Sequence, residues 1–255
     1  MYSVILGQLS VSSKTLVAMP KHRGGFLVLS CFAIDEISEF HRLLAAVNVQ
    51  RFTNEACLQI HATQLNSVVR NLSLKLLEYE VTRKKFRGRA KAAGDVEVID
   101  LFKKFDKEFT AASSLSGKKV ADAARDQMTA HFSIDEAIKA VERRDGDLKH
   151  NVFMHADIGN SHYTLGEEIL FLNLFEQPSV MGANEVGNAK KGFTDWAYWV
   201  LEMIKCVRNF HSDYFALVRR AHFPNETISR IYANVDQEKD VGRIGLTYLP
   251  LFWFN

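Results

Sequence analysis

Apolar residues recur at intervals of three or four along most of the chain, which is the spacing of one face of an α-helix. The longest of these stripes predict helices over residues 26–48, 58–79, 94–111 and 193–222. The last stripe is rich in aromatic residues, and we interpret it as core packing or as the seam of a dimer. Only four prolines interrupt the chain. These patterns together predict an all-α protein.

Composition changes and helix breakers divide the chain into three parts. Residues 1–23 mix β-branched residues and serines without a helical period, and are expected to form a short strand or an ordered arm. Residues 24–177 are expected to form a helical bundle. Residues 178–255 are expected to form a linker followed by a C-terminal helical extension.

The third part carries three local predictions. Residues 178–192 are rich in Gly and Asn and predict a mobile loop. Pro224 ends the long helix, and Asn225 is predicted to cap a short one. The apolar tail, residues 246–255, is expected to dock on the body of the protein or on a second subunit.

Composition limits the class of protein without naming a function. Hydrophobic residues make up 47% and charged residues 24% of the chain, as in ordinary globular proteins. The three cysteines have no metal-binding spacing and fit a reducing compartment. Neither a signal peptide nor an apolar run of about 20 residues, long enough to span a membrane, is evident. A cytoplasmic protein is therefore expected.

One short segment concentrates positive charge. The formal net charge is only +2, so the field of the whole protein gives little attraction to nucleic acid. Residues 83–91, however, contain six basic residues in nine. They suit a solvated helix end, where cations complement the helix dipole. They also suit a phosphate-binding patch for RNA, whose residues would be Arg83, Lys84, Lys85, Arg87 and Arg89.

Residues 118–136 contain the residue types of a catalytic site. Alanines without Gly or Pro predict a helix to about His131, and Ser133 is predicted to cap the next helix as part of a capping box. Arg125 and His131 would then border one groove. His131 can exchange protons near neutral pH, and Arg125 can donate two N–H groups to a phosphate. Asp126 would orient one of these two side chains.

The spacing of Arg125 and His131 resembles the R-x4–6-H signature of the HEPN superfamily (higher eukaryotes and prokaryotes nucleotide-binding domains). The surrounding phrase, ARDQMTAHFSIDEAI, is similar to the abortive-infection branch of that superfamily. The resemblance covers residues 40–175 and implies an up-and-down helical bundle. Arg144 and His150 repeat the spacing, but the glycine between them and a predicted helix end make this second match the weaker one.

The resemblance also implies a function. It implies a metal-independent endoribonuclease with catalytic residues Arg125, Asp126 and His131, leaving 2′,3′-cyclic phosphate ends on RNA. Two protomers would form a composite cleft as a homodimer, without metal or cofactor. A toxin or phage-defence role, with an antitoxin or other neutralising partner, is implied as well. Family proteins often carry Asn or His where this chain has Asp126.

Two alternatives stay open. Arg125 would be structural if it paired with Asp122 and if His131 capped its helix by binding a terminal carbonyl. The chain would then be a non-catalytic helical RNA-binding or protein-interaction module. A loop-like segment also carries potential metal ligands, but their spacing matches no metal motif, so no metal site is expected. These ligands are His150, His155, Asp157 and His162.

Overall fold

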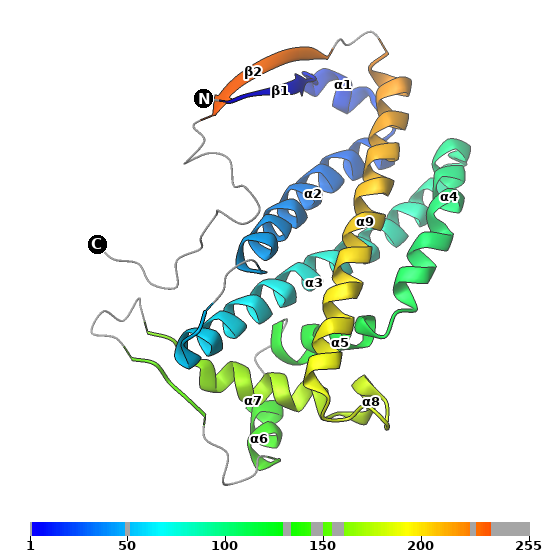
Figure 1. Ribbon diagram of the computed structural model, residues 1–255. Helices are drawn as coiled ribbons and strands as arrows, with labels where there is room; N and C mark the ends of the chain where they lie inside the picture. The colour runs from blue at the N-terminus through cyan, green and yellow to red at the C-terminus, as the bar shows by residue number, and fades with distance from the viewer. Residues whose placement is uncertain are drawn as a thin grey trace.

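Helices make up most of the computed structural model, which describes residues 2–48, 52–129, 134–143, 150–154, 161–224 and 228–235. The predicted all-α class is therefore confirmed. The helices, labelled as in Figure 1, are α1 (Ser13–Ala18), α2 (Lys21–Asn48), α3 (Glu55–Ala92), α4 (Val96–Ser113), α5 (Gly117–Ala124), α6 (Ile134–Glu142), α7 (Thr164–Phe175), α8 (Pro178–Met181) and α9 (Ala189–His222). None of the described helices is long and apolar enough to cross a membrane.

Helix α9 is the central element of the bundle. It crosses α2 and α3 and contacts both of them as well as α4 and α5 (Figure 1). The aromatic members of its predicted stripe are all fully buried: Trp196, Trp199, Phe210 and Tyr214. Trp196 also donates its indole N–H to Ser73 Oγ of α3 at 2.8 Å. The stripe is core packing, and α9 shares one core with α2 to α5.

Aromatic rings from four helices meet around α9. Phe210 packs against Phe102 and Phe105 of α4, with ring centroids 5.1 and 5.7 Å apart. Phe26 of α2 stacks on Phe86 of α3 at 4.0 Å. Such ring pairs add about 0.5–1.5 kcal/mol beyond the burial of their surface. Phe86 of α3 also packs against Phe102 of α4, with ring centroids 5.7 Å apart, and this contact fixes α3 relative to α4 beside the cavity between them.

Helix α3 buries its predicted stripe only in part. Leu72 and Leu76 are fully buried, whereas Leu58 in the first turn is 46% exposed. Between them, His61 places Nε2 2.8 Å from the carbonyl oxygen of Val47. His61 is thus a hydrogen-bonded histidine at the contact between α3 and the end of α2. The first turn of α3 extends past the core, so its apolar residues are left partly in solvent.

A buried ion pair joins α2 to the start of α4. Asp95 caps α4 by accepting the Val98 N–H at 3.3 Å. Arg23 donates to the same carboxylate from Nε at 2.6 Å and from Nη2 at 2.5 Å, and His22 Nε2 lies 2.7 Å from it. Burial acts to raise the pKa of Asp95, but the hydrogen bonds from Arg23, His22 and the cap outweigh it and hold this pKa at about 2.

Two strands from distant parts of the chain form an antiparallel pair. β1 (Tyr2–Gln8), inside the predicted arm, pairs with β2 (Ser229–Val235), with Tyr2 opposite Val235. The short helix predicted from Asn225 is wrong, because residues 229–235 are strand. Ile, Tyr and Val are residue types that favour extended backbone, and β1 supplies a pairing partner. Asn225 itself and the apolar tail 246–255 lie outside the described residues.

The mobile loop predicted over residues 178–192 is largely regular. Helix α8 buries Val180, and α9 already begins at Ala189. Gly187, with a φ of 83° that favours glycine, donates its N–H to the carbonyl of Phe175 at 2.9 Å. Gly187 therefore lies in an ordered turn rather than in a mobile loop. The anchoring bond back to α7 was not visible in the sequence.

Candidate functional site

The motif segment departs from a plain α-helix. The α-helix predicted to run to His131 ends as α5 at Ala124, and a π-helical turn, η1 (Arg125–Thr129), follows it directly. Met128 of η1 is buried, and Gln127 exchanges two hydrogen bonds with Gln177, at 3.1 and 2.9 Å. These contacts anchor the turn on the bundle. Single π-helical turns occur frequently at functional sites.

Arg125 begins this turn with a partly exposed side chain (35%). Its Nε and Nη2 each lie 2.8 Å from Asp126 Oδ1. This hydrogen bond raises the pKa of Arg125, with burial opposing it. Asp122 instead accepts from Lys118 at 2.6 Å. The contact of Asp126 is the one expected of a residue that orients Arg125.

The other motif residues are only partly described. His131 and Ser133 lie outside the described residues, as does Arg144 of the weaker match. Helix α6 begins at Ile134, where the capping box predicted it. Three apolar residues on one face of α6 are exposed: Ile134 (72%), Ile138 (48%) and Val141 (57%). An uncovered apolar face thus directly follows the motif.

The histidine-rich segment contains no metal cluster in its described part. His150 Nδ1 lies 3.0 Å from Glu168 Oε2. His162 pairs through its backbone with Phe153, at 2.7 and 2.8 Å. No group of three potential ligands occurs among the described residues. His155 and Asp157 fall outside them.

The basic run on α3 divides between two environments. Arg83 is buried, with its guanidinium carbon 3.7 Å from the centroid of the Phe109 ring on α4. Arg87 pairs with Asp106 of α4 at 2.8 Å. Lys85 and Arg89 are exposed on the other faces of α3. Because each residue advances about 100° around a helix, one continuous run cannot present all its charges to one side.

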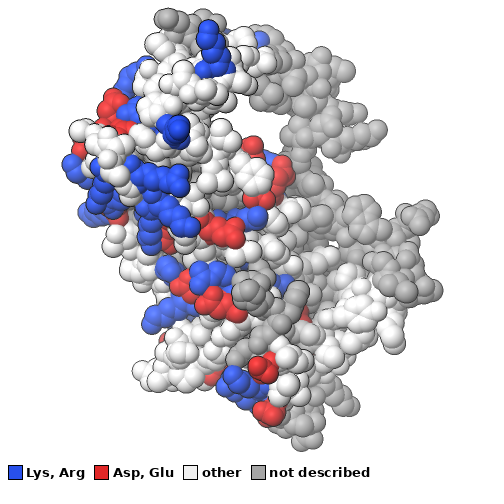
Figure 2. Space-filling view, turned by 180° about the vertical axis from the view of Figure 1, so that it is seen from behind, with Lys and Arg blue, Asp and Glu red and all other residues white. Residues whose placement is uncertain are grey.

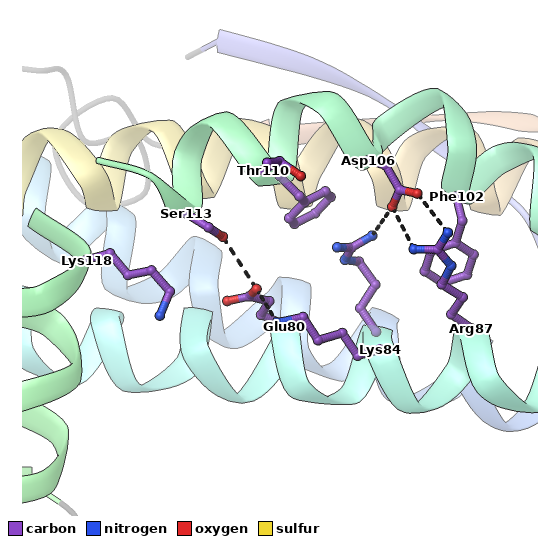
Figure 3. Close-up of a pocket in the computed structure, with 10 residues that line it drawn as sticks. Glu80, Lys84, Arg87, Phe102, Asp106, Thr110, Ser113 and Lys118 are labelled. Carbon is purple, nitrogen blue, oxygen red and sulfur yellow. Dashed lines mark hydrogen bonds and ion pairs between the residues drawn. The ribbon is translucent and has the colours of Figure 1, made fainter. Parts of the chain in front are cut away.

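Arg83 and Arg87 line a cavity of about 410 Å³ between α3 and α4. Lys84 and Glu80, paired at 2.7 Å, lie on its α3 wall, and Lys118 of α5 closes one end (Figure 3). Figure 2 shows Lys and Arg side chains gathered over part of one face of the molecule, with acidic side chains among them. The charged residues of the cavity lining are four basic ones, Arg83, Lys84, Arg87 and Lys118, and two acidic ones, Glu80 and Asp106.

The α4 wall of this cavity was missed in the sequence. Asp106, Thr110 and Ser113 line it and lie at i, i+4 and i+7, so they form one polar stripe along α4. Such a stripe facing a neighbouring helix is a detectable signal for a polar pocket. The stripe indicates a polar pocket only once it is known that Arg83 and Glu80 of α3 face it.

No family model matches this chain, and no curated protein and no solved structure is similar enough to be matched to it. Its function must therefore be inferred from the motif segment, the exposed face of α6 and the cavity.

Proposed function

We propose that the protein is a metal-independent endoribonuclease in which Arg125 and His131 act on RNA. The observation that carries this proposal is the partly exposed guanidinium of Arg125, held by Asp126, six residues before His131. A cytoplasmic location gives such an enzyme access to RNA. A toxin or phage-defence role, controlled by an antitoxin or other neutralising partner, follows from the same resemblance to HEPN proteins.

The chemistry needs a base, an acid and a cation. His131 takes the proton from the 2′-OH, whose oxygen attacks the adjacent phosphorus. Arg125 stabilises the charge that develops on the phosphate oxygens. A second imidazole protonates the departing 5′-oxygen, so the products are a 2′,3′-cyclic phosphate and a 5′-hydroxyl. In this proposal the second imidazole is His131 of another copy.

The test is cleavage of RNA by purified protein in EDTA. His131→Ala is expected to lower the cleavage rate by at least about 100-fold, since a positioned acid–base group contributes 10²–10⁴. His150→Ala is the matched control, because His150 belongs to the weaker match with the same spacing, and it should keep the wild-type rate. Analysis of product ends should find cyclic phosphate. Activity that appears only when Mg²⁺ is added would contradict the mechanism.

The exposed face of α6 supports a homodimer. Ile138→Glu is expected to raise the dimer dissociation constant by at least about fivefold, because burying an unpaired polar group costs about 1–3 kcal/mol. Light scattering over a concentration series measures the assembly. Val96→Glu places the same charge on an exposed apolar site of α4 and should change nothing. An unchanged dimer in Ile138→Glu would remove α6 from the interface.

A second candidate is a non-catalytic RNA-binding or protein-interaction module. The exposed side chains of Lys84, Lys85 and Arg89 on α3 favour it. Binding of uncleaved RNA that weakens steeply with salt, without any His131-dependent cleavage, would select this candidate.

A further inference from the structure

The cavity between α3 and α4 contains a buried guanidinium with unused N–H groups. Arg83 is only 4% exposed, and its Nε and Nη1 have no hydrogen-bond partner among the described residues. Asp106 Oδ1 lies 3.9 Å from Nη1, which is too far for a hydrogen bond. Burial lowers the pKa of Arg83, and the nearby carboxylates of Asp106 and Glu80 oppose this. Buried donors without partners are unfavourable, and a bound acceptor would relieve them.

Phe109 fixes Arg83 without using its N–H groups. The guanidinium carbon lies 3.7 Å from the centroid of the Phe109 ring and 5.4 Å from the centroid of the Phe102 ring. A cation–π contact occupies the face of the planar guanidinium and leaves the N–H groups at its edge free. Arg83 is therefore held in one place with donors available, which is the arrangement of a preorganised anion site.

The other cations of the cavity lining are matched by carboxylates. Three pairs do this: Lys84 with Glu80 at 2.7 Å, Arg87 with Asp106 at 2.8 Å, and Lys118 with Asp122 at 2.6 Å. Among the basic residues that line the cavity, Arg83 is thus the one without a hydrogen-bonded carboxylate partner in the described part of the chain. Figure 3 shows Thr110 and Ser113 on the α4 wall across from Lys84, where hydroxyl groups can add to the polar lining.

We propose that this cavity binds a phosphomonoester of a small organic molecule. Two N–H groups of one guanidinium match two oxygens of a phosphate group. With one surplus cation, the site suits a single phosphate rather than a polyphosphate. A cavity of about 410 Å³ lies in the size range of small-molecule sites, and the Phe102 and Phe109 rings face the organic part. The site does not include Arg125, so it stands apart from RNA cleavage.

Calorimetric titration of the full chain, without RNA, tests the proposal with two probes. Phenyl phosphate presents the ester, and inorganic phosphate presents the same anion alone. Saturable binding of both is expected, with phenyl phosphate the tighter ligand because its ring enters the apolar part of the cavity. Equal affinity for the two probes would contradict the proposal that the ligand is a phosphomonoester and would assign the site to free phosphate.

Two pairs of matched variants locate the site. Arg83→Met is expected to lower the affinity for phenyl phosphate by at least about tenfold. Its melting temperature should be no lower than that of wild type, since replacing a buried ion by a hydrophobic residue is often neutral or stabilising. Arg89→Met removes the same charge from an exposed position of α3 and should bind normally. Lys84→Glu, at the partly exposed edge of the cavity, should also weaken binding, whereas the neighbouring Lys85→Glu should not.

The second pair keeps the test decisive if Arg83→Met fails to fold. Weakening confined to the two cavity variants supports the site. Either the absence of saturable binding in wild type or full affinity in both cavity variants would overturn it.

Discussion

Replacing Asp95 by asparagine is expected to lower the free energy of unfolding by about 3 kcal/mol. Asparagine keeps the size of the side chain and can still cap α4 by accepting the Val98 N–H, so the change isolates the negative charge. The Arg23 side chain is 11% exposed and then keeps only Glu97, at 3.0 Å, as a hydrogen-bonded carboxylate among the described residues. Glu97 is 52% exposed and compensates a buried guanidinium poorly.

Urea denaturation with linear extrapolation measures this loss. Asp100→Asn is the matched control, because Asp100 also lies on α4 and pairs with Lys103 at 2.8 Å, but both side chains are more than half exposed. Its loss is expected to stay below about 0.5 kcal/mol. Equal losses in the two variants would show that burial of the Arg23–Asp95 pair does not matter.

The contribution of Asp95 to stability should also depend on pH in one direction. The pKa of Asp95 is about 2 in the folded protein, below the ordinary value of 3.8. A carboxyl group with a lowered folded pKa stabilises the fold above its unfolded pKa, and this contribution is lost as the pH falls toward the folded value. Wild type should therefore lose its advantage over Asp95→Asn below about pH 4. If the difference in the free energy of unfolding between wild type and Asp95→Asn increased on acidification, the stabilising role of the ion pair would be contradicted.

The core helices could be predicted because their apolar residues repeat over many turns. Helix α9 begins only four residues before its predicted start, residue 193, and ends at His222 as predicted. The apolar stripe of α3 is recognisable only to residue 79, and the helix continues through the basic run to Ala92, with Arg89 and Lys91 in its last turn, as the helix-end interpretation of that run predicts. Strand β2 was missed for another reason. Its partner β1 is more than 200 residues away, so no local pattern reveals the pairing.

The candidate sites could be predicted less well. Residue types identified Arg125 and Asp126, but helix propensities do not separate an α-turn from the π-turn that holds them. Charge density identified the basic run without showing which side chains are buried. Arg83 faces Phe109 of α4 only because α3 and α4 pack at this point, and that is a tertiary property.

Replacing Gly117 by alanine is expected to cost about 3 kcal/mol, at the upper end of the cost of overpacking. Helix α5 begins in direct contact with the backbone of α9. A Cβ atom on Gly117 would lie 2.0 Å from the carbonyl oxygen of Asp195 and 2.8 Å from Trp196 Cα. Both are backbone atoms, so no side-chain rotation relieves the overlap, and Trp196 is fully buried in a packed core. Helix α5 must move away from α9.

The same displacement is expected to reach the motif, because η1 continues α5 without a break. Gly88→Ala is the matched control: its Cβ meets nothing within 4 Å in the interior of α3, and it should stabilise the protein by about 0.5–1 kcal/mol. If Arg125 acts on RNA, Gly117→Ala should cleave more slowly than Gly88→Ala at a temperature where thermal unfolding shows both to be folded. Wild-type stability in Gly117→Ala would mean that α5 and α9 do not approach this closely. A destabilised Gly117→Ala variant that cleaves RNA at the normal rate would instead show that the position of α5 does not affect the chemistry at Arg125.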